Sequence, residues 1–173
     1  MDEKNKIPGV SFIKRNIGTI IGLILLVIIV SISTPKFLTS SNILNLLKSN
    51  SVNAIISCGM LLAILMGEID ISVGSTVGLS GIIGAYMITN VGLPVVPTVL
   101  ICLGVGALVG IVNGVAISYL KVPAFVATLA TQSIGRGLTE IISGGVTIRV
   151  RNTGYTALGN QNVAGISIII IYA

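Results

Sequence analysis

Histidine and tryptophan are absent from this chain of 173 residues, and only two cysteines are present. The lack of histidine removes the commonest protein metal ligand and the side chain that most often carries protons near neutral pH. Cys58 and Cys102 lie deep inside apolar segments and have no metal-ligand spacing, so we expect both thiols to pack as small apolar side chains. The sequence therefore predicts no catalytic residue, no metal site and no cofactor bound by this chain.

Charged residues are also scarce, at 9% of the sequence against roughly 25% in an average soluble domain. The hydrophobic share is 53% and the mean hydropathy is +1.05, values typical of an integral membrane protein. Lys and Arg number 10 against 5 Asp and Glu, but no basic run with interleaved aromatic residues is present. We therefore expect the lipid bilayer, and not nucleic acid, as a partner.

Apolar runs bounded by proline, glycine and polar clusters predict an all-α polytopic membrane protein. Five transmembrane helices are expected over residues 17–32, from the cap cluster 39–42 to 66, from 72 or 73 to 89, 95–120 and 124–142. The start of a sixth opens at Gly165 and stops at Ala173, about nine residues on, where a span needs about 20. The transmembrane permease domain 17–173 is therefore expected to be incomplete at its C-terminus.

Positive charge before the first apolar run predicts the orientation of the chain. Lys4, Lys6, Lys14 and Arg15 all precede residue 17, so the segment 1–16 is expected in the cytoplasm. No small-residue cleavage site follows the first helix, which is therefore expected to stay as an anchor. Counting five crossings places residues 68–72 and Lys121 in the cytoplasm and residues 143–164 outside.

The nonapeptide Gly67–Ser75 is the most specific motif of the chain. Glu68 and Asp70 precede an expected helix start, where the helix dipole favours carboxylates and free backbone N–H groups need acceptors. Three hypotheses stay open: Asp70 or Ser72 caps the helix, the acidic loop contacts a cytoplasmic partner, or the carboxylates couple transport to an ion. The flanking glycines, Gly67 and Gly74, are able to adopt backbone angles that other residues avoid.

Two expected helices carry polar side chains at successive i, i+4 positions, which lipid cannot satisfy. The first face is Asn45, Ser49, Asn53 and Ser57 with Lys48 beside them, and the second is Thr128, Gln132, Arg136 and Glu140. Hydrogen bonds between helices would explain the first face, and an ion pair between Arg136 and Glu140 would explain the charges of the second. The alternative is that these faces line a translocation pathway, for which the candidates are Asn53, Ser57, Thr128, Gln132, Arg136 and Glu140.

Glycines are regularly spaced in the run 95–120, and a nucleotide-binding motif of the Walker type is absent from the sequence. Gly106, Gly110 and Gly114 have the small-xxx-small spacing that lets helices approach closely, so a packing role is expected. The sequence holds no Gly-x-x-x-x-Gly-Lys-Ser/Thr motif. Energy from a nucleotide would therefore have to come from another chain.

Several sequence blocks resemble, in order and spacing, the inner-membrane permeases of ribose-type ABC sugar importers, which are related to the branched-chain amino acid permeases. The blocks are residues 51–55 with Gly59-Met60, 67–75, Asn113-Gly114, 121–129 and Arg136-Gly137. The resemblance implies the N-terminal half of a permease of roughly ten helices. It further implies a second permease copy in a homodimer or heterodimer, a cytoplasmic ABC ATPase that hydrolyses the ATP, and an extracytoplasmic sugar-binding protein.

The function that the resemblance implies is the transmembrane subunit of an ATP-driven importer of a ribose-like monosaccharide in the bacterial inner membrane, with the helix over 124–142 lining its pathway. Such a subunit is not itself an enzyme. The alternatives are an ion-coupled secondary carrier that uses Glu68 and Asp70, and an inactive truncated fragment of the permease. The sequence departs from the family at Glu68, where many members have glycine, and the cytoplasmic coupling helix of the family lies beyond the sixth span.

Overall fold

The computed structural model describes residues 15–163 and 166–172. Almost all of the expected cytoplasmic segment 1–16 lies outside the described residues, as do Gly165 and Ala173 of the expected sixth span. Apart from two strands of two residues each, the regular structure is helical, which confirms the all-α class. The chain divides into residues 1–47 and residues 48–173, and each unit is described by itself.

The described part of the first unit holds helix α2 (Ile17–Ser33) and the beginning of α3 (Ser40–Leu65). Both helices begin and end within about two residues of the predicted bounds. Pro35 stops α2, whose last turn is closed by a hydrogen bond from the backbone N–H of Thr34 to the Val30 carbonyl (2.8 Å). The expected cap of α3 is confirmed, because the Thr39 hydroxyl oxygen accepts from the Asn42 backbone N–H (3.4 Å).

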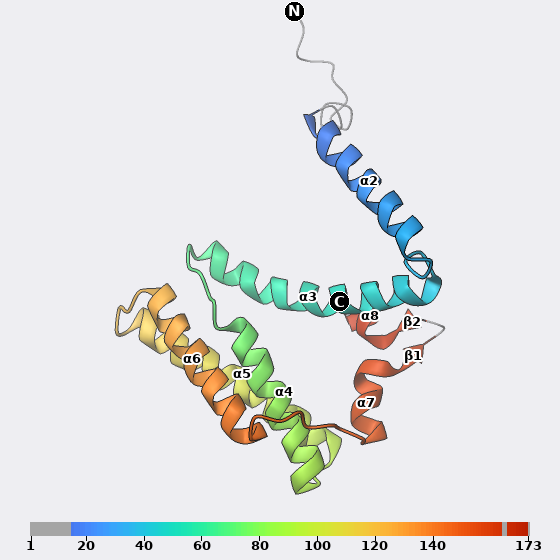
Figure 1. The fold of residues 1–173 in the computed structure, drawn as a ribbon. Coiled ribbons are helices and arrows are strands. Elements are labelled where there is room, and N and C mark those ends of the chain that lie inside the picture. Colours follow the sequence, from blue (N-terminus) through green and yellow to red (C-terminus); the bar gives the residue numbers. More distant parts are fainter. Residues whose placement is uncertain (1–14, 164–165, 173) are drawn as a thin grey trace, which may run out of the picture. The chain divides into compact units, whose positions relative to one another are not determined.

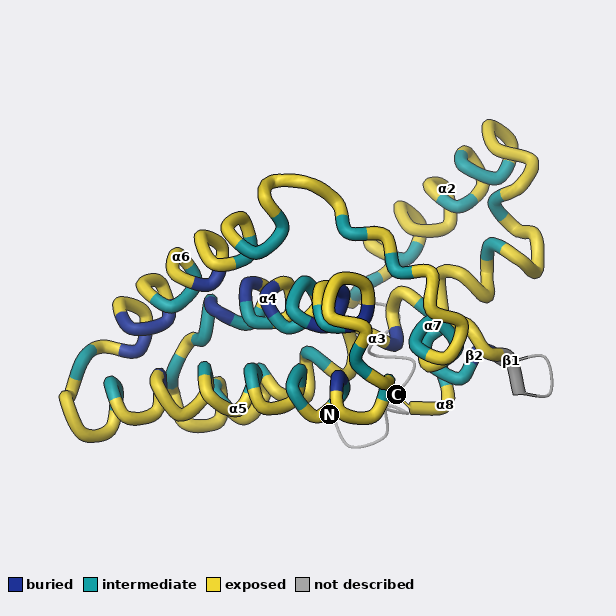
Figure 2. The backbone as a smooth tube through the Cα atoms, turned by 90° about the horizontal axis from the view of Figure 1, so that it is seen from below, coloured by how far each residue is buried: buried dark blue, intermediate teal, exposed yellow. Residues whose placement is uncertain are grey.

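The second unit is built on three helices, α4 (Val73–Tyr86), α5 (Val95–Ser118) and α6 (Ala124–Ser143) (Figure 1). Helix α4 lies between α5 and α6, and the buried residues gather where α4 meets α6 (Figure 2). The two helices approach closely at Gly135 of α6, where an added Cβ would lie 3.1 Å from the Ser75 Oγ of α4. Glycine at this position therefore lets the two helix backbones come together.

Helix α4 continues as a five-residue π-helix, η1 (Met87–Val91), which Gly92 ends in a left-handed conformation (φ 76°). The predicted helix over 72–89 is thus confirmed in extent, but its last turn is wider than an α-helix. After α6, the chain forms α7 (Thr153–Asn160), the paired strands β1 (Asn162–Val163) and β2 (Ile166–Ser167), and α8 (Ile168–Tyr172). Helix α7 lies in the stretch that the sequence analysis expected only as an outer loop.

The small-residue contact expected on α5 is not made by the described part of the chain. A Cβ added at Gly106, Gly110 or Gly114 would meet no atom of another element within 4 Å. The close contacts use other glycines, because a Cβ at Gly84 would lie 2.6 Å from the Tyr155 hydroxyl and one at Gly135 would press on Ser75. The packing role of the α5 glycines stays a prediction for a helix outside the described residues.

Two described helices, α3 and α5, are long and apolar enough to cross a membrane, and α2 is a shorter apolar helix. Their large apolar side chains are mostly exposed, as lipid-facing residues would be. Helix α4 runs for only 14 residues before η1, and α6 carries Arg136 and Glu140 among its 20 residues. Membrane-spanning character is therefore found for two helices, and the predicted count of five spans is not confirmed.

Candidate functional site

The signature loop begins with a tight end to α3. Gly67 has a left-handed backbone (φ 77°), its N–H bonds the Ile64 carbonyl (2.9 Å), and the Glu68 N–H bonds the Ala63 carbonyl (3.0 Å). This pair of bonds is a Schellman motif, in which glycine takes the left-handed angle without a Cβ clash. The unusual angle predicted for Gly67 is confirmed, whereas Gly74 is an ordinary helical residue of α4.

Asp70 shapes the entry into α4. Its Oδ1 accepts from the Ser72 backbone N–H (2.8 Å) and from the Ser72 hydroxyl (2.6 Å). A carboxylate at this point satisfies a backbone donor ahead of the helix and lies at the positive end of the helix dipole. Asp70 thus closes a turn just ahead of α4 by bonding the N-cap residue Ser72, and the Ser72 side chain makes no cap bond of its own.

The same loop is hydrogen-bonded to both neighbouring helices. The Asn113 amide of α5 donates from Nδ2 to the Ser72 Oγ (3.0 Å), and the Thr131 hydroxyl of α6 donates to the Asn113 Oδ1 (2.5 Å). Ser72 and Asn113 are 1% and 6% exposed. We call Asp70, Ser72, Asn113 and Thr131 the polar junction, since they join the loop, α5 and α6 through one chain of hydrogen bonds.

The carboxylate of Asp70 fixes which group donates in each hydrogen bond of the polar junction. An ionised carboxylate only accepts, so the Ser72 hydroxyl proton goes to Asp70. The Ser72 oxygen then accepts from Asn113, which fixes the amide with its nitrogen toward Ser72 and its oxygen toward Thr131. Thr131 must therefore donate, and every bond of the chain has a defined donor and acceptor.

Thr128 makes a second connection between α6 and the loop. Its side chain is 1% exposed, and its hydroxyl lies 2.8 Å from the Ala124 carbonyl oxygen and 3.4 Å from that of Ile69. The sequence analysis placed Thr128 with the pathway-lining candidates because of its i, i+4 spacing. The structure instead buries this side chain against the signature loop.

The other pathway candidates lie apart from the polar junction. Gln132 is half-buried on α6, whereas Arg136 and Glu140 are exposed and form no ion pair with each other in the described part of the chain. The expected pair has the less favourable order, since a basic residue N-terminal to an acidic one at i, i+4 opposes the helix dipole. On α3, Asn53 and Ser57 are exposed, and the Ser57 hydroxyl donates to the Asn53 backbone carbonyl (2.7 Å).

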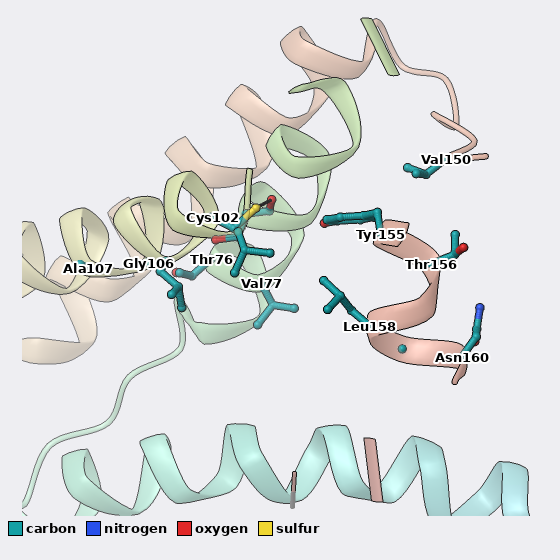
Figure 3. Close-up of a pocket in the computed structure, with 14 residues that line it drawn as sticks. Thr76, Val77, Cys102, Gly106, Ala107, Val150, Tyr155, Thr156, Leu158 and Asn160 are labelled. Atoms are coloured by element: carbon teal, nitrogen blue, oxygen red, sulfur yellow. Dashed lines mark hydrogen bonds between the residues drawn. The ribbon is translucent and has the colours of Figure 1, made fainter. Parts of the chain in front are cut away.

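A groove of about 910 Å³ lies between α7 and the pair α4 and α5 (Figure 3). Tyr155 of α7 points toward Cys102 of α5, and burial, followed by the nearby Cys102 thiol, raises the pKa of the Tyr155 phenol above 10.0. None of the six pathway candidates belongs to the lining of this groove. The sequence analysis missed α7, although Asn152 gives an N-cap signal, and in the structure its Oδ1 accepts from the Tyr155 N–H (3.0 Å).

Most of the chain matches one known protein family. Residues 42–172 match the family described as the permease component of the branched-chain amino acid transport system, and the match contains the whole polar junction. The chain belongs to this permease family. No solved structure matches it significantly.

The relatives of this chain include sugar permeases. The ribose import permease protein RbsC of Haemophilus influenzae is 40% identical over 87% of the chain and 47% of its own length. The protein of the same name from Bacillus subtilis is 40% identical over 90% of the chain and 49% of its own length. The xylose transport system permease protein XylH of Escherichia coli is 34% identical over 72% of the chain. The chain thus spans about half the length of the ribose permeases that it matches.

Proposed function

We propose that this chain forms part of the transmembrane subunit of an ATP-driven importer of a ribose-like monosaccharide. The observation that carries the proposal is the 40% identity to ribose import permeases over most of the chain. Exposed apolar side chains along α3 and α5 support a location in the bilayer. The proposed setting is the bacterial inner membrane, with five spans and a cytoplasmic N-terminus.

The proposed partners follow from the division of labour in such an importer. The sequence has no nucleotide-binding motif of its own, so a cytoplasmic ABC ATPase would bind and hydrolyse ATP. An extracytoplasmic sugar-binding protein would deliver the sugar, and a second permease copy would complete the pathway. The small-residue stripe of α5 is one surface on which a further helix is able to pack.

The proposed sugar route borders α6 outward from the polar junction. Gln132 is half-buried on α6, and an amide both donates and accepts hydrogen bonds, as passage of a polyhydroxyl ligand requires. Arg136 and Glu140 follow it along the helix and are exposed. Thr128 is left out of this proposal because the loop covers it, and Asn53 and Ser57 stay candidates on α3.

An ion-coupled carrier is the competing function, and it would use Glu68 and Asp70. The geometry favours a structural role for Asp70, since its Oδ1 accepts two hydrogen bonds from Ser72. The relatives at 40% identity are named as ribose import permeases, and the one at 34% identity is named as a xylose transport system permease. The carrier is therefore not adopted as the proposal.

The test is sugar-dependent ATP hydrolysis by the permease that carries this sequence, reconstituted with its ATPase and sugar-binding protein. Ribose-loaded binding protein should stimulate hydrolysis, and Gln132→Ala should lower sugar uptake without reducing assembly. Ser133→Ala is the matched control, because the Ser133 hydroxyl is exposed and bonds only its own helix at the Leu129 carbonyl. Equal uptake by the two variants would remove Gln132 from the route, and no stimulation by any loaded sugar-binding protein would refute the importer.

A further inference from the structure

The apolar side chains of the signature loop are at most half-buried, as Ile71 is. Met66 and Ile69 are 75% and 61% exposed, so their side chains do not pin the loop to the helices. Two hydrogen bonds reach the loop from α5 and α6, one from Asn113 to Ser72 and one from Thr128 to the Ile69 carbonyl. The position of the loop thus depends on polar groups of α5 and α6.

The turn between α5 and α6 lies at the same end of the three-helix bundle. Lys121 in this turn has a left-handed backbone (φ 55°), an angle that is uncommon for a residue with a Cβ. Asn113 lies five residues before the end of α5, and Thr131 lies seven residues after the start of α6. The polar junction therefore ties the signature loop to α5 and α6 about one to two helical turns from the connection between these helices.

We infer that Asn113 and Thr131 are positioning residues for transport, which hold the signature loop to α5 and α6 and transmit movement of α6 to the loop. The inference rests on the proposed function for its transport readout. It concerns a contact between elements, and not a residue that touches the sugar.

The two threonines of α6 are able to release the loop and still keep a hydrogen bond of their own. The Thr131 hydroxyl lies 2.5 Å from the Asn113 Oδ1 and also 2.9 Å from the Ala127 carbonyl of its own helix. Thr128 has the same choice between the Ile69 carbonyl and the Ala124 carbonyl. If α6 shifts, each hydroxyl keeps a partner within α6, and the main cost is that the buried Asn113 Oδ1 loses the hydrogen bond from Thr131. The connection is thus strong enough to position the loop and able to be broken during a transport cycle.

A loop-labelling experiment tests the connection without requiring transport. Cys58→Ser and Cys102→Ser remove both native thiols, and Ile71→Cys places a half-buried reporter inside the loop. Thr131→Val should raise the rate of maleimide labelling at position 71 roughly fivefold, the effect of losing one typical hydrogen bond. Thr131→Ser, which keeps the hydroxyl, should label at the unmodified rate.

Thr139→Val is the matched control on the same helix. Thr139 is half-buried like Thr131 and bonds its own helix at the Gly135 carbonyl (2.8 Å), and among the described residues it makes no hydrogen bond to another element. Ser72→Ala is a second variant that removes the middle of the polar junction with the loss of one oxygen atom, and it should label as fast as Thr131→Val. Equal labelling of the Thr131→Val and Thr139→Val proteins would overturn the inference.

The second readout is the ATP hydrolysed for each sugar imported by the assembled importer. A contact with a purely structural role would leave this ratio unchanged. Thr131→Val should increase the ATP hydrolysed for each sugar imported at least twofold, while Thr139→Val and Thr131→Ser keep the unmodified ratio. An unchanged ratio in Thr131→Val would overturn the positioning role even if labelling rises. If the unmodified importer moves no sugar, the proposed function fails, and the labelling comparison still decides whether the polar junction holds the loop.

Discussion

The contact between Gly135 and Ser75 gives the sharpest test of how α4 and α6 pack. A Cβ on residue 135 would lie 3.1 Å from the Ser75 Oγ and 3.2 Å from its Cβ, which is tighter than ordinary van der Waals contact. Gly137, one half-turn along α6, is exposed and has no atom of another element within 4 Å of its Cβ position. Gly135→Ala and Gly137→Ala therefore differ in packing alone.

The magnitude follows from two opposing effects. Each substitution should gain about 1 kcal/mol from the higher helix propensity of alanine. Overpacking costs about 1–3 kcal/mol, and it applies only at residue 135 because Ser75 is buried and its hydroxyl bonds the Ser72 carbonyl (2.7 Å). The propensity gain cancels in the comparison, so Gly135→Ala should be about 1–3 kcal/mol less stable than Gly137→Ala.

Unfolding of the purified protein in mixed micelles, followed by circular dichroism, measures this difference. Adding Ser75→Gly to Gly135→Ala removes the atoms in the way and should recover part of the packing loss. Equal unfolding free energies for Gly135→Ala and Gly137→Ala would refute the close approach of α4 to α6. If the double variant is no more stable than the sum of the two single changes predicts, the stability loss in Gly135→Ala does not come from its contact with Ser75.

Three further predictions concern topology, ionisation and charge. A cysteine at Ile71 should react with membrane-impermeant reagents only from the cytoplasmic side and one at Asn152 only from outside, and labelling from the opposite sides would refute the five crossings. Because burial raises the Tyr155 pKa above 10.0, one of the four tyrosines should ionise later than the others in a titration followed at 295 nm, and Tyr155→Phe should remove this late component. The raised pKa also means that stability from the neutral phenol is present below pH 10 and is lost as the pH rises further. Since Arg136 and Glu140 are exposed and unpaired in the described residues, a double-mutant cycle with Arg136→Gln and Glu140→Gln should give a coupling energy below about 0.5 kcal/mol, whereas a larger value would show an ion pair.

Helices α2 to α6 could be predicted from the sequence because proline, glycine or polar residues that end helices bound each apolar run. Pro35, Gly67, Pro94 and Pro123 all stand at or next to the helix ends that the structure shows. The placement of Asp70 just ahead of α4 could also be predicted, since a carboxylate just before a helix has few competing uses. These features depend on neighbouring residues, and local sequence contains the information that decides them.

The partners of the polar side chains could not be predicted in the same way. A buried amide in an apolar helix needs hydrogen-bond partners, but the sequence does not say that Asn113 lies between Ser72 and Thr131. Regular i, i+4 spacing also grouped Thr128 with Arg136, although the first is buried by the loop and the second is exposed. Residues on one face of a long helix can be buried at one end and exposed at the other, and i, i+4 spacing does not show which residues are buried.

Uptake of labelled sugar into proteoliposomes tests the central claim most directly. The permease that carries this sequence would be reconstituted with its ATPase and sugar-binding protein and supplied with ribose, xylose or leucine, since its family description refers to amino acids and its relatives to sugars. We predict uptake of a pentose that requires ATP, stops with a hydrolysis-deficient ATPase and does not respond to ionophores. Uptake of leucine in place of a pentose, or sugar uptake driven by an ion gradient without ATP, would contradict the assignment.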